Sequence, residues 1–197
     1  MARRAETIEL AVLGLLHESP MHGYELRKQV TELLGWGRVL SYGSLYPCLK
    51  QMLRSGLICE DTTPSDADTL AARASRRGRI VYKLTAEGKE RFASLVSAAG
   101  PSAWEDETFG VHFAFFGQTD AEVRLRILEG RRSRLEDRLE SVRTGVRRGR
   151  ERLDAYTLQL QEHGLESVER EVRWLNELIA TERSGGPRTG NTTKHTP

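Results

Sequence analysis

A long heptad repeat in the second half of the chain constrains the fold more than any other feature. Eleven positions between 125 and 160 alternate steps of three and four residues, and nine hold Leu, Val or Tyr, with Arg132 and Gly149 as the exceptions. This spacing places the apolar side chains on one stripe of a helix, as in coiled coils. A second stripe covers 165–179, so we expect a helix to 160 and another after a break at His163-Gly164.

The first stripe requires a partner. It spans ~50 Å of helix at the usual rise, and leaving it in water would be strongly unfavourable. A hairpin with residues 165–179 covers only part of it, so we predict that a second copy of the chain covers the rest. The residues expected to form this homodimer contact are Leu128, Leu135, Leu139, Val142, Val146, Leu153, Tyr156, Leu160, Val172, Leu175 and Ile179.

The first half of the chain alternates apolar helical segments with two short strands. An apolar helix comes first, Ser19-Pro20 are suited to start a second, and Pro47 favours a third that becomes regular near Ser44. Alternating residues then indicate two strands, and Thr85 is expected to cap a fourth helix. In chain order these elements cover residues 8–16, 19–34, 41–55, 57–61, 79–85 and 86–98.

This order of elements is typical of a winged helix-turn-helix. We expect a mostly α-helical chain with a small β wing, divided at Gly100-Pro101. The predicted parts are a winged-helix DNA-binding domain over 1–100, an antiparallel or coiled-coil helical dimerisation domain over 101–183 and a disordered tail over 184–197.

The third helix has the two faces that DNA reading requires. Leu45, Leu49 and Met52 form an apolar stripe, while the opposite face carries hydroxyls and a lysine that suit phosphates and base edges. An arginine-rich wing tip adds cations. For Tyr46, a packing role with the hydroxyl in water is favoured as much as a DNA contact. The predicted DNA-binding residues are Tyr24, Ser41, Tyr42, Ser44, Tyr46, Lys50, Arg76, Arg77, Arg79 and Lys83.

Charge separates the two halves of the chain. Residues 1–100 hold 14 Lys and Arg against 11 Asp and Glu, whereas residues 101–184 hold 14 against 17. A basic first half beside an acidic second half weakly favours a polyanionic partner for the first. A two-fold dimer of such domains would present two third helices to successive major grooves, which predicts a palindromic operator.

Several sequence blocks follow one another in order within residues 8–92. They are Leu13-Gly14-Leu15-Leu16, Met21-His22-Gly23-Tyr24-Glu25-Leu26, Ser41-Tyr42-Gly43-Ser44-Leu45-Tyr46-Pro47, Leu49-Lys50, Gly56-Leu57-Ile58 and Val81-Tyr82-Lys83-Leu84-Thr85-Ala86-Glu87-Gly88. In this combination they resemble the PadR family of bacterial transcriptional regulators. The resemblance implies a homodimeric repressor with an N-terminal winged helix and a C-terminal dimerisation domain of the long subgroup. One departure is the linker over 62–78, which is longer than the short wing tip usual in the family.

Two clusters suggest a small-molecule effector. Trp104, Phe109, His112, Phe113 and Phe116 could wall a site for a planar aromatic or phenolic compound, although helical spacing favours simple packing for the phenylalanines.

The second cluster is rich in arginine. Arg143 and Arg147, with three neighbouring arginines, could hold an anion such as a nucleotide, although a solvated coiled-coil flank is the more common role of a charge run.

The sequence disfavours an enzyme. Five scattered histidines form no catalytic or metal-binding spacing, and we expect no cofactor or metal. Cys48 and Cys59 lack C-x-x-C spacing, and Cys48 suits a small buried hydrophobe better than a redox switch. No apolar run suggests a membrane span or signal peptide, so a cytoplasmic, nucleoid-associated protein is expected. A coiled-coil adaptor that binds protein through its winged helix is the alternative function.

Overall fold

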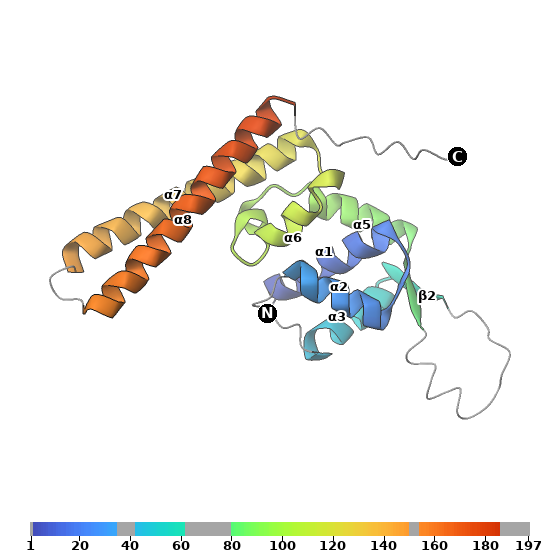
Figure 1. Cartoon of the computed structure of the whole chain (residues 1–197). Helices are drawn as coiled ribbons and strands as arrows, with labels where there is room; N and C mark the ends of the chain where they lie inside the picture. The colour runs from blue at the N-terminus through green and yellow to red at the C-terminus, as the bar shows by residue number, and fades with distance from the viewer. Residues whose placement is uncertain (1, 35–41, 62–79, 150–153, 186–197) are drawn as a thin grey trace, which may run out of the picture. The chain divides into compact units, whose positions relative to one another are not determined.

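A computed structural model describes residues 2–34, 42–61, 80–149 and 154–185 (Figure 1). The chain divides into two compact units. The winged-helix unit comprises Met1–Ala98 and Glu105–Thr119, and the hairpin unit comprises Ala99–Trp104 and Asp120–Pro197. None of the described helices is long and apolar enough to cross a membrane.

The winged-helix unit is mostly helical with a small antiparallel sheet, as predicted. The sheet has three strands in the order β1-β3-β2. The elements are α1 (Ala2–Glu18), β1 (Met21–His22), α2 (Gly23–Leu34), α3 (Tyr42–Arg54), β2 (Ile58–Asp61), β3 (Val81–Leu84), α5 (Ala86–Val96), α6 (Phe109–Ala114) and the 3-10 turn η2 (Phe116–Gln118).

Helix α1 lies at the centre of this unit. Ala11, Val12 and Leu13 are completely buried because α1 packs against α2, α3 and α5 on different sides. An apolar helix surrounded by others needs no polar face, which explains the nearly continuous apolar run in its sequence.

Two helix starts differ from the prediction. Ser19-Pro20 do not begin a helix: Met21 and His22 form β1, which pairs with Tyr82 and Val81 of β3, and α2 begins only at Gly23. The backbone hydrogen bonds of this short strand therefore override the local helix-start signal.

Helix α3 begins at Tyr42, earlier than Ser44, and contains Pro47. The proline is the sixth residue of the helix, beyond the first four N–H groups that lack a helical partner, so it removes one backbone hydrogen bond from the second turn. As predicted, α5 begins after Thr85, whose side chain accepts a hydrogen bond from the N–H of Gly88 at 3.0 Å.

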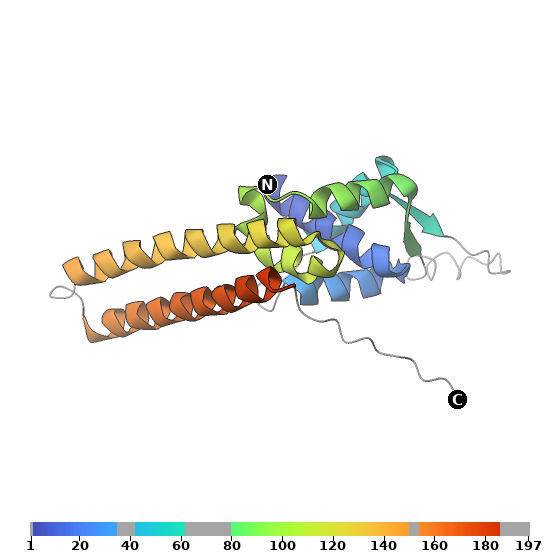
Figure 2. The same cartoon turned by 90° about the horizontal axis from the view of Figure 1, so that it is seen from above.

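The hairpin unit consists of the 3-10 turn η1 (Pro101–Trp104) and two long helices, α7 (Ala121–Gly149) and α8 (Ala155–Arg183). The two helices lie side by side and antiparallel (Figure 2). Residues 150–153 lie outside the described part.

The predicted helix to 160 is wrong, as is the break at His163-Gly164. Helix α7 ends at Gly149, and α8 runs uninterrupted through His163-Gly164. Asp154 explains the new start, because its carboxylate accepts hydrogen bonds from the N–H groups of Tyr156 and Thr157 at 3.0 Å each. This N-cap satisfies donors that a helix start leaves unpaired. The Thr157 hydroxyl, which donates to the same carboxylate at 2.6 Å, and then the backbone N–H groups lower the pKa of Asp154.

The boundary between the units also differs from a single division at residue 100. Phe115 is 2 % exposed and lies against Gly14 of α1, where a Cβ atom would come within 2.1 Å of the phenylalanine ring. Phe115 also packs edge-on against Phe92 of α5, with ring centroids 5.5 Å apart. These contacts place residues 105–119 in the winged-helix unit.

Trp104 belongs to the hairpin unit. A Cβ atom on Gly130 would lie 2.5 Å from the indole ring, and Nη1 of Arg131 donates to the Trp104 carbonyl at 3.2 Å. The chain therefore passes between the two units three times, between residues 98 and 99, 104 and 105, and 119 and 120.

Candidate nucleic-acid interface

Helix α3 presents one buried and one exposed face. Leu45, Leu49 and Met52 are at most 1 % exposed and pack into the core. Tyr46 is 38 % exposed, and Lys50, one turn later, is also exposed. The helix therefore offers a phenol and an ammonium group to solvent on a backbone fixed by the core.

Several predicted residues of this region cannot be placed. Tyr42 and Ser44 lie in α3, but their side chains are not described, and Ser41 lies outside the described residues. The same holds for Arg76, Arg77 and Arg79 in the wing linker.

The start of α2 adds an aromatic and a cation. Tyr24 is 68 % exposed, and the Arg27 guanidinium carbon lies 5.8 Å from the centre of its ring. This distance is within the range of a cation–π contact. Gly23 packs closely on the ring of Tyr82, with 3.2 Å between the ring and a Cβ built on the glycine. Arg27 is not among the predicted DNA-binding residues, although its position three residues after Tyr24 on a helix places the two side chains near each other.

The base of the wing is a paired β2–β3 ribbon. Glu60 lies opposite Tyr82, and Cys59 lies opposite Lys83. The ammonium of Lys83 forms an ion pair with Asp61, which raises the pKa of the lysine. Lys83 is a predicted DNA contact, but its pairing with Asp61 could not be predicted, because only the strand register brings the two residues together.

Tyr82 connects the ribbon with the helices. It is 7 % exposed, and burial, followed by the nearby Glu60 carboxylate and Tyr46, raises the pKa of its hydroxyl. The phenol therefore remains neutral at ordinary pH and can donate a hydrogen bond.

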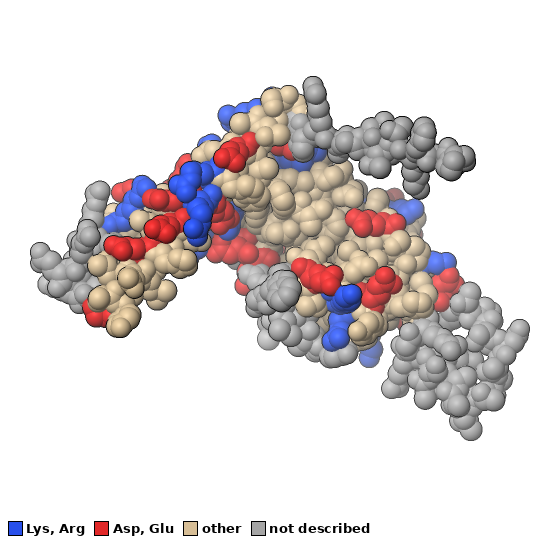
Figure 3. Space-filling view, viewed as in Figure 1, with Lys and Arg blue, Asp and Glu red and all other residues tan. Residues whose placement is uncertain are grey.

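Charge on the visible face is mixed. Figure 3 shows Lys and Arg interspersed with Asp and Glu, and no continuous basic patch covers the described residues of that face. On the described part of this face, attraction to a polyanion would therefore come from individual Lys and Arg side chains and not from a continuous basic surface.

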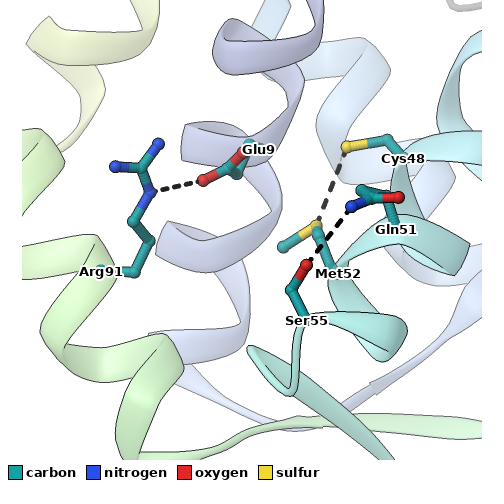
Figure 4. Close-up of polar contacts among 6 residues, drawn as sticks. All are labelled: Glu9, Cys48, Gln51, Met52, Ser55 and Arg91. Carbon is teal, nitrogen blue, oxygen red and sulfur yellow. Dashed lines mark hydrogen bonds and ion pairs between the residues drawn. The ribbon is translucent and has the colours of Figure 1, made fainter.

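Cys48 is a packing residue in the described unit. Its Sγ lies 3.8 Å from Sδ of the buried Met52 (Figure 4). Burial, together with the nearby Glu9 carboxylate, raises the pKa of the thiol to about 11, so the unreactive protonated form dominates. Glu9 itself pairs with Arg91 at 2.7 Å and thereby joins α1 to α5.

The predicted aromatic effector residues fall into both units. Phe109, Phe113 and Phe116 form a cluster in the winged-helix unit, with centroid distances of 5.8 Å and 4.9 Å along the series. His112 lies on the same short helix, and burial lowers its pKa to about 4. Trp104 belongs to the hairpin unit.

The described part of the predicted anion-binding arginine cluster already pairs with a carboxylate of the same chain. Arg143 donates to Glu169 of α8 at 2.6 Å, and the side chain of Arg147 is not described. This pair fits the alternative role as a solvated flank of the helical hairpin.

Much of the predicted dimer seam is used within one chain. Leu128, Leu135, Leu139, Leu175 and Ile179 are at most 9 % exposed in the hairpin unit. Val142 and Val172 are half-buried, whereas Tyr156 is 86 % and Leu160 71 % exposed. Leu153 lies outside the described residues, and the side chain of Val146 is not described.

Residues 12–94 match the transcriptional regulator PadR-like family. The curated proteins include no significant match. Among solved structures, Bacillus subtilis PadR in complex with operator DNA is 19 % identical with a TM-score of 0.38, and the alignment covers 88 % of this chain and 98 % of that one.

Two further structures give similar values. The same Bacillus subtilis protein in complex with p-coumaric acid is 18 % identical with a TM-score of 0.39, covering 90 % of this chain and 99 % of that one. A PadR-like transcriptional regulator from Bacillus cereus is 18 % identical with a TM-score of 0.38, covering 90 % and 98 %. These whole-chain likenesses are weak, so the assignment of residues 12–94 to the PadR-like family depends on the family match alone.

Proposed function

We propose, from the PadR-like transcriptional regulator domain that residues 12–94 form, that this chain is a DNA-binding repressor that acts as a homodimer on a palindromic operator. The observation that carries the proposal is the division of α3 into a buried apolar face and an exposed face with Tyr46 and Lys50. A helix fixed by the core on one side and polar on the other suits insertion into a major groove.

The flanking elements add contacts of the kind that position a protein on DNA. Arg27 and Tyr24 at the start of α2 can reach phosphates with a guanidinium and a hydroxyl, and Lys50 supplies a further cation. Tyr46 supplies a hydroxyl that can serve a phosphate or a base edge.

The DNA proposal is tested by fluorescence anisotropy with a duplex from the chain's own promoter region. We expect Tyr46→Ala and Lys50→Ala each to weaken binding about tenfold, consistent with the loss of one good base or phosphate contact. Lys89→Ala removes the same charge from an exposed position on α5 and should leave affinity nearly unchanged. Equal affinity of all three variants and the wild type would remove α3 from the interface.

The dimer proposal rests on what the hairpin leaves exposed. Tyr156, Leu160 and Trp174 are 86 %, 71 % and 38 % exposed, and their spacing places them on one side of α8. Large apolar side chains in such a row favour contact with another protein surface. A second copy is the occupant consistent with a palindromic operator.

Sedimentation of the full chain tests this surface. Leu160→Glu combined with Tyr156→Glu should convert dimers to monomers, because both carboxylates would be buried in the contact. Gln159→Glu adds charge at an exposed position between the two and serves as the control. An unchanged dimer in the double variant would contradict this interface.

Release by a small planar effector completes the proposal. Phe113 and Phe116 are half-buried, so their rings are partly accessible in the winged-helix unit. p-Coumaric acid serves as the probe: we expect it to weaken operator binding in the wild type and to lose this effect in Phe116→Ala. An identical loss of operator affinity in both proteins, or none in the wild type, would refute an effector site at this cluster.

The alternative is an adaptor that binds protein through its winged helix. Promoter DNA distinguishes the two functions, because protein–DNA affinity falls steeply with salt as counterions return to the phosphates. Absent or salt-insensitive retardation would favour the adaptor.

A further inference from the structure

We propose that Asp61 increases the selectivity of DNA binding by forming an ion pair with Lys83 at the base of the wing. The ion pair keeps the lysine ammonium from neutralising a phosphate of the DNA backbone. The inference rests on the proposed DNA-binding function. It assigns to Asp61 a role in limiting sequence-independent attraction.

The strand register places the two residues together. Lys83 of β3 lies opposite Cys59 of β2, and Asp61 is two residues further along β2. Successive side chains of a strand point to opposite faces, so Cys59, Asp61 and Lys83 share one face of the ribbon. Lys83 and Asp61 are diagonal neighbours, and their charged groups form an ion pair.

This face of the ribbon is directed to solvent. The side chains of Lys83 and Asp61 are 44 % and 38 % exposed, whereas Ile58 and Tyr82, which point to the opposite face, are 2 % and 7 % exposed. Both charges are therefore within reach of a polyanion, but the lysine already has a carboxylate partner.

Binding of a phosphate by Lys83 has an electrostatic cost in this arrangement. If the ammonium moves to a phosphate, the Asp61 carboxylate loses its partner and remains close to the DNA, where like charges repel. If the ammonium stays with Asp61, it neutralises no phosphate and releases no counterion. In both cases Lys83 contributes little to sequence-independent affinity.

Contacts elsewhere then carry proportionally more of the binding. Phosphate attraction acts on every duplex, whereas base contacts such as those proposed for α3 act only on the operator. A carboxylate that cancels one wing cation therefore improves the ratio of specific to non-specific affinity.

The experiment compares the salt dependence of binding in variants of the full chain. Fluorescence anisotropy is measured with the promoter duplex and with a random duplex of equal length. The variants are Asp61→Asn, Asp61→Glu, Lys83→Met and the double variant Asp61→Asn with Lys83→Met. Glu90→Gln removes one carboxylate from an exposed position on α5 and controls for net charge.

Release of Lys83 should add one phosphate contact. We expect Asp61→Asn to steepen the slope of log K against log salt by about 0.9 on both duplexes, an extra three- to fourfold fall in affinity between about 50 and 200 mM salt. Lys83→Met alone should leave the slope nearly unchanged, and in the double variant it should abolish the gain. Asp61→Glu and Glu90→Gln should behave like the wild type.

Two results would overturn the inference while the proposed function stands. One is an unchanged slope in Asp61→Asn although Lys50→Ala still weakens operator binding. The other is a slope that Lys83→Met reduces by about one in the otherwise wild-type chain, since Lys83 would then already contact a phosphate. A wild type that binds neither duplex overturns both. Circular dichroism of each variant identifies any loss of folding, and Asp61→Glu retains the pair if Asp61→Asn unfolds.

Discussion

The two units of this chain are stabilised by different interactions. In the winged-helix unit, α1 is enclosed by other helices, and an aromatic ring occupies the space above a glycine. In the hairpin unit, a narrow apolar seam is flanked by ion pairs between α7 and α8. These pairs are Arg124–Glu182, Glu129–Arg183, Arg131–Glu171 and Arg143–Glu169. One unit is therefore stabilised mainly by the close fit of side chains in its core, whereas the other combines an apolar seam with ion pairs between its two helices.

The strongest test of this comparison removes the aromatic ring that completes the first core. Phe115→Ala should destabilise the winged-helix unit by about 3–5 kcal/mol, because a buried phenylalanine is lost and the groove above Gly14 is left empty. Hydrogen exchange of the α1 amides measures the loss. Phe116→Ala, at a half-buried ring nearby, is the matched control and should cost less. Equal losses of stability in the two variants would show that the contact between Phe115 and Gly14 adds no stability beyond the burial of one ring.

The second test removes a buried charge from the hairpin unit. Arg131 is 7 % exposed and contacts both Glu171 and the Trp104 carbonyl. Arg131→Met should cost about 1–3 kcal/mol, since it removes the hydrogen bond to the Trp104 carbonyl and leaves the Glu171 carboxylate, 33 % exposed, without its cation. Faster exchange in α7 and α8, with α1 unaffected, is the expected pattern. Uniform loss across both units would show that they do not have separate sources of stability.

A titration of His112 tests whether the winged-helix core excludes charge. Its pKa is lowered from about 6.5 to about 4, so the unfolded chain takes up this proton before the folded chain does. Stability present at pH 7 is therefore lost as the pH falls from about 6.5 to 4, with a cost of about 1.4 kcal/mol by pH 5.5.

The measurement is the difference in unfolding free energy between pH 7 and pH 5.5. His112→Gln should reduce this difference, whereas the exposed His163→Gln in α8 should leave it unchanged. A pH dependence identical in the wild type and His112→Gln would contradict a buried neutral imidazole.

The smallest expected effect concerns the exposed end of the hairpin. The Arg143 side chain is 43 % exposed in its pair with Glu169, so Arg143→Met should cost only about 0.2–1 kcal/mol. Compared with Arg131→Met in the same exchange experiment, this variant shows how far burial determines the value of an arginine in this unit. A loss as large as that of Arg131→Met would be inconsistent with solvent screening.

Local patterns were sufficient to predict much of the fold. The apolar run of α1, the Thr85 cap and the alternation of β3 each lie within a few residues, and the structure contains all three. The two-residue strand β1 was missed because Met21-His22 is too short for an alternating pattern and depends on pairing with β3. The start of α8 at Ala155 was missed because the heptad pattern continues through residues 149–156, although an aspartate at position 154 is a common N-cap.

The candidate site shows the same limit. Helical periodicity separated the buried Leu45, Leu49 and Met52 of α3 from its exposed Tyr46 and Lys50, since both faces follow from one segment. It could not show that Lys83 has a carboxylate partner, because Asp61 and Lys83 are joined only by strand pairing. The same holds for the predicted dimer contacts. The heptad pattern marks the apolar residues but does not show which of them pack between α7 and α8 of one chain.

The position of Phe115 sets the minimum segment that recombination could exchange as an intact DNA-reading module. The family match stops at residue 94, yet a fragment cut there would lose the ring that fills the groove over Gly14. A transferable segment would have to extend to Thr119 and would therefore include the η1 turn. This turn contains Trp104, which packs against Gly130 of the original hairpin unit. We therefore expect exchange between relatives to keep residues 99–119 together with Gly14 and Gly130, which contact Phe115 and Trp104, or to replace the segment and both glycines at once.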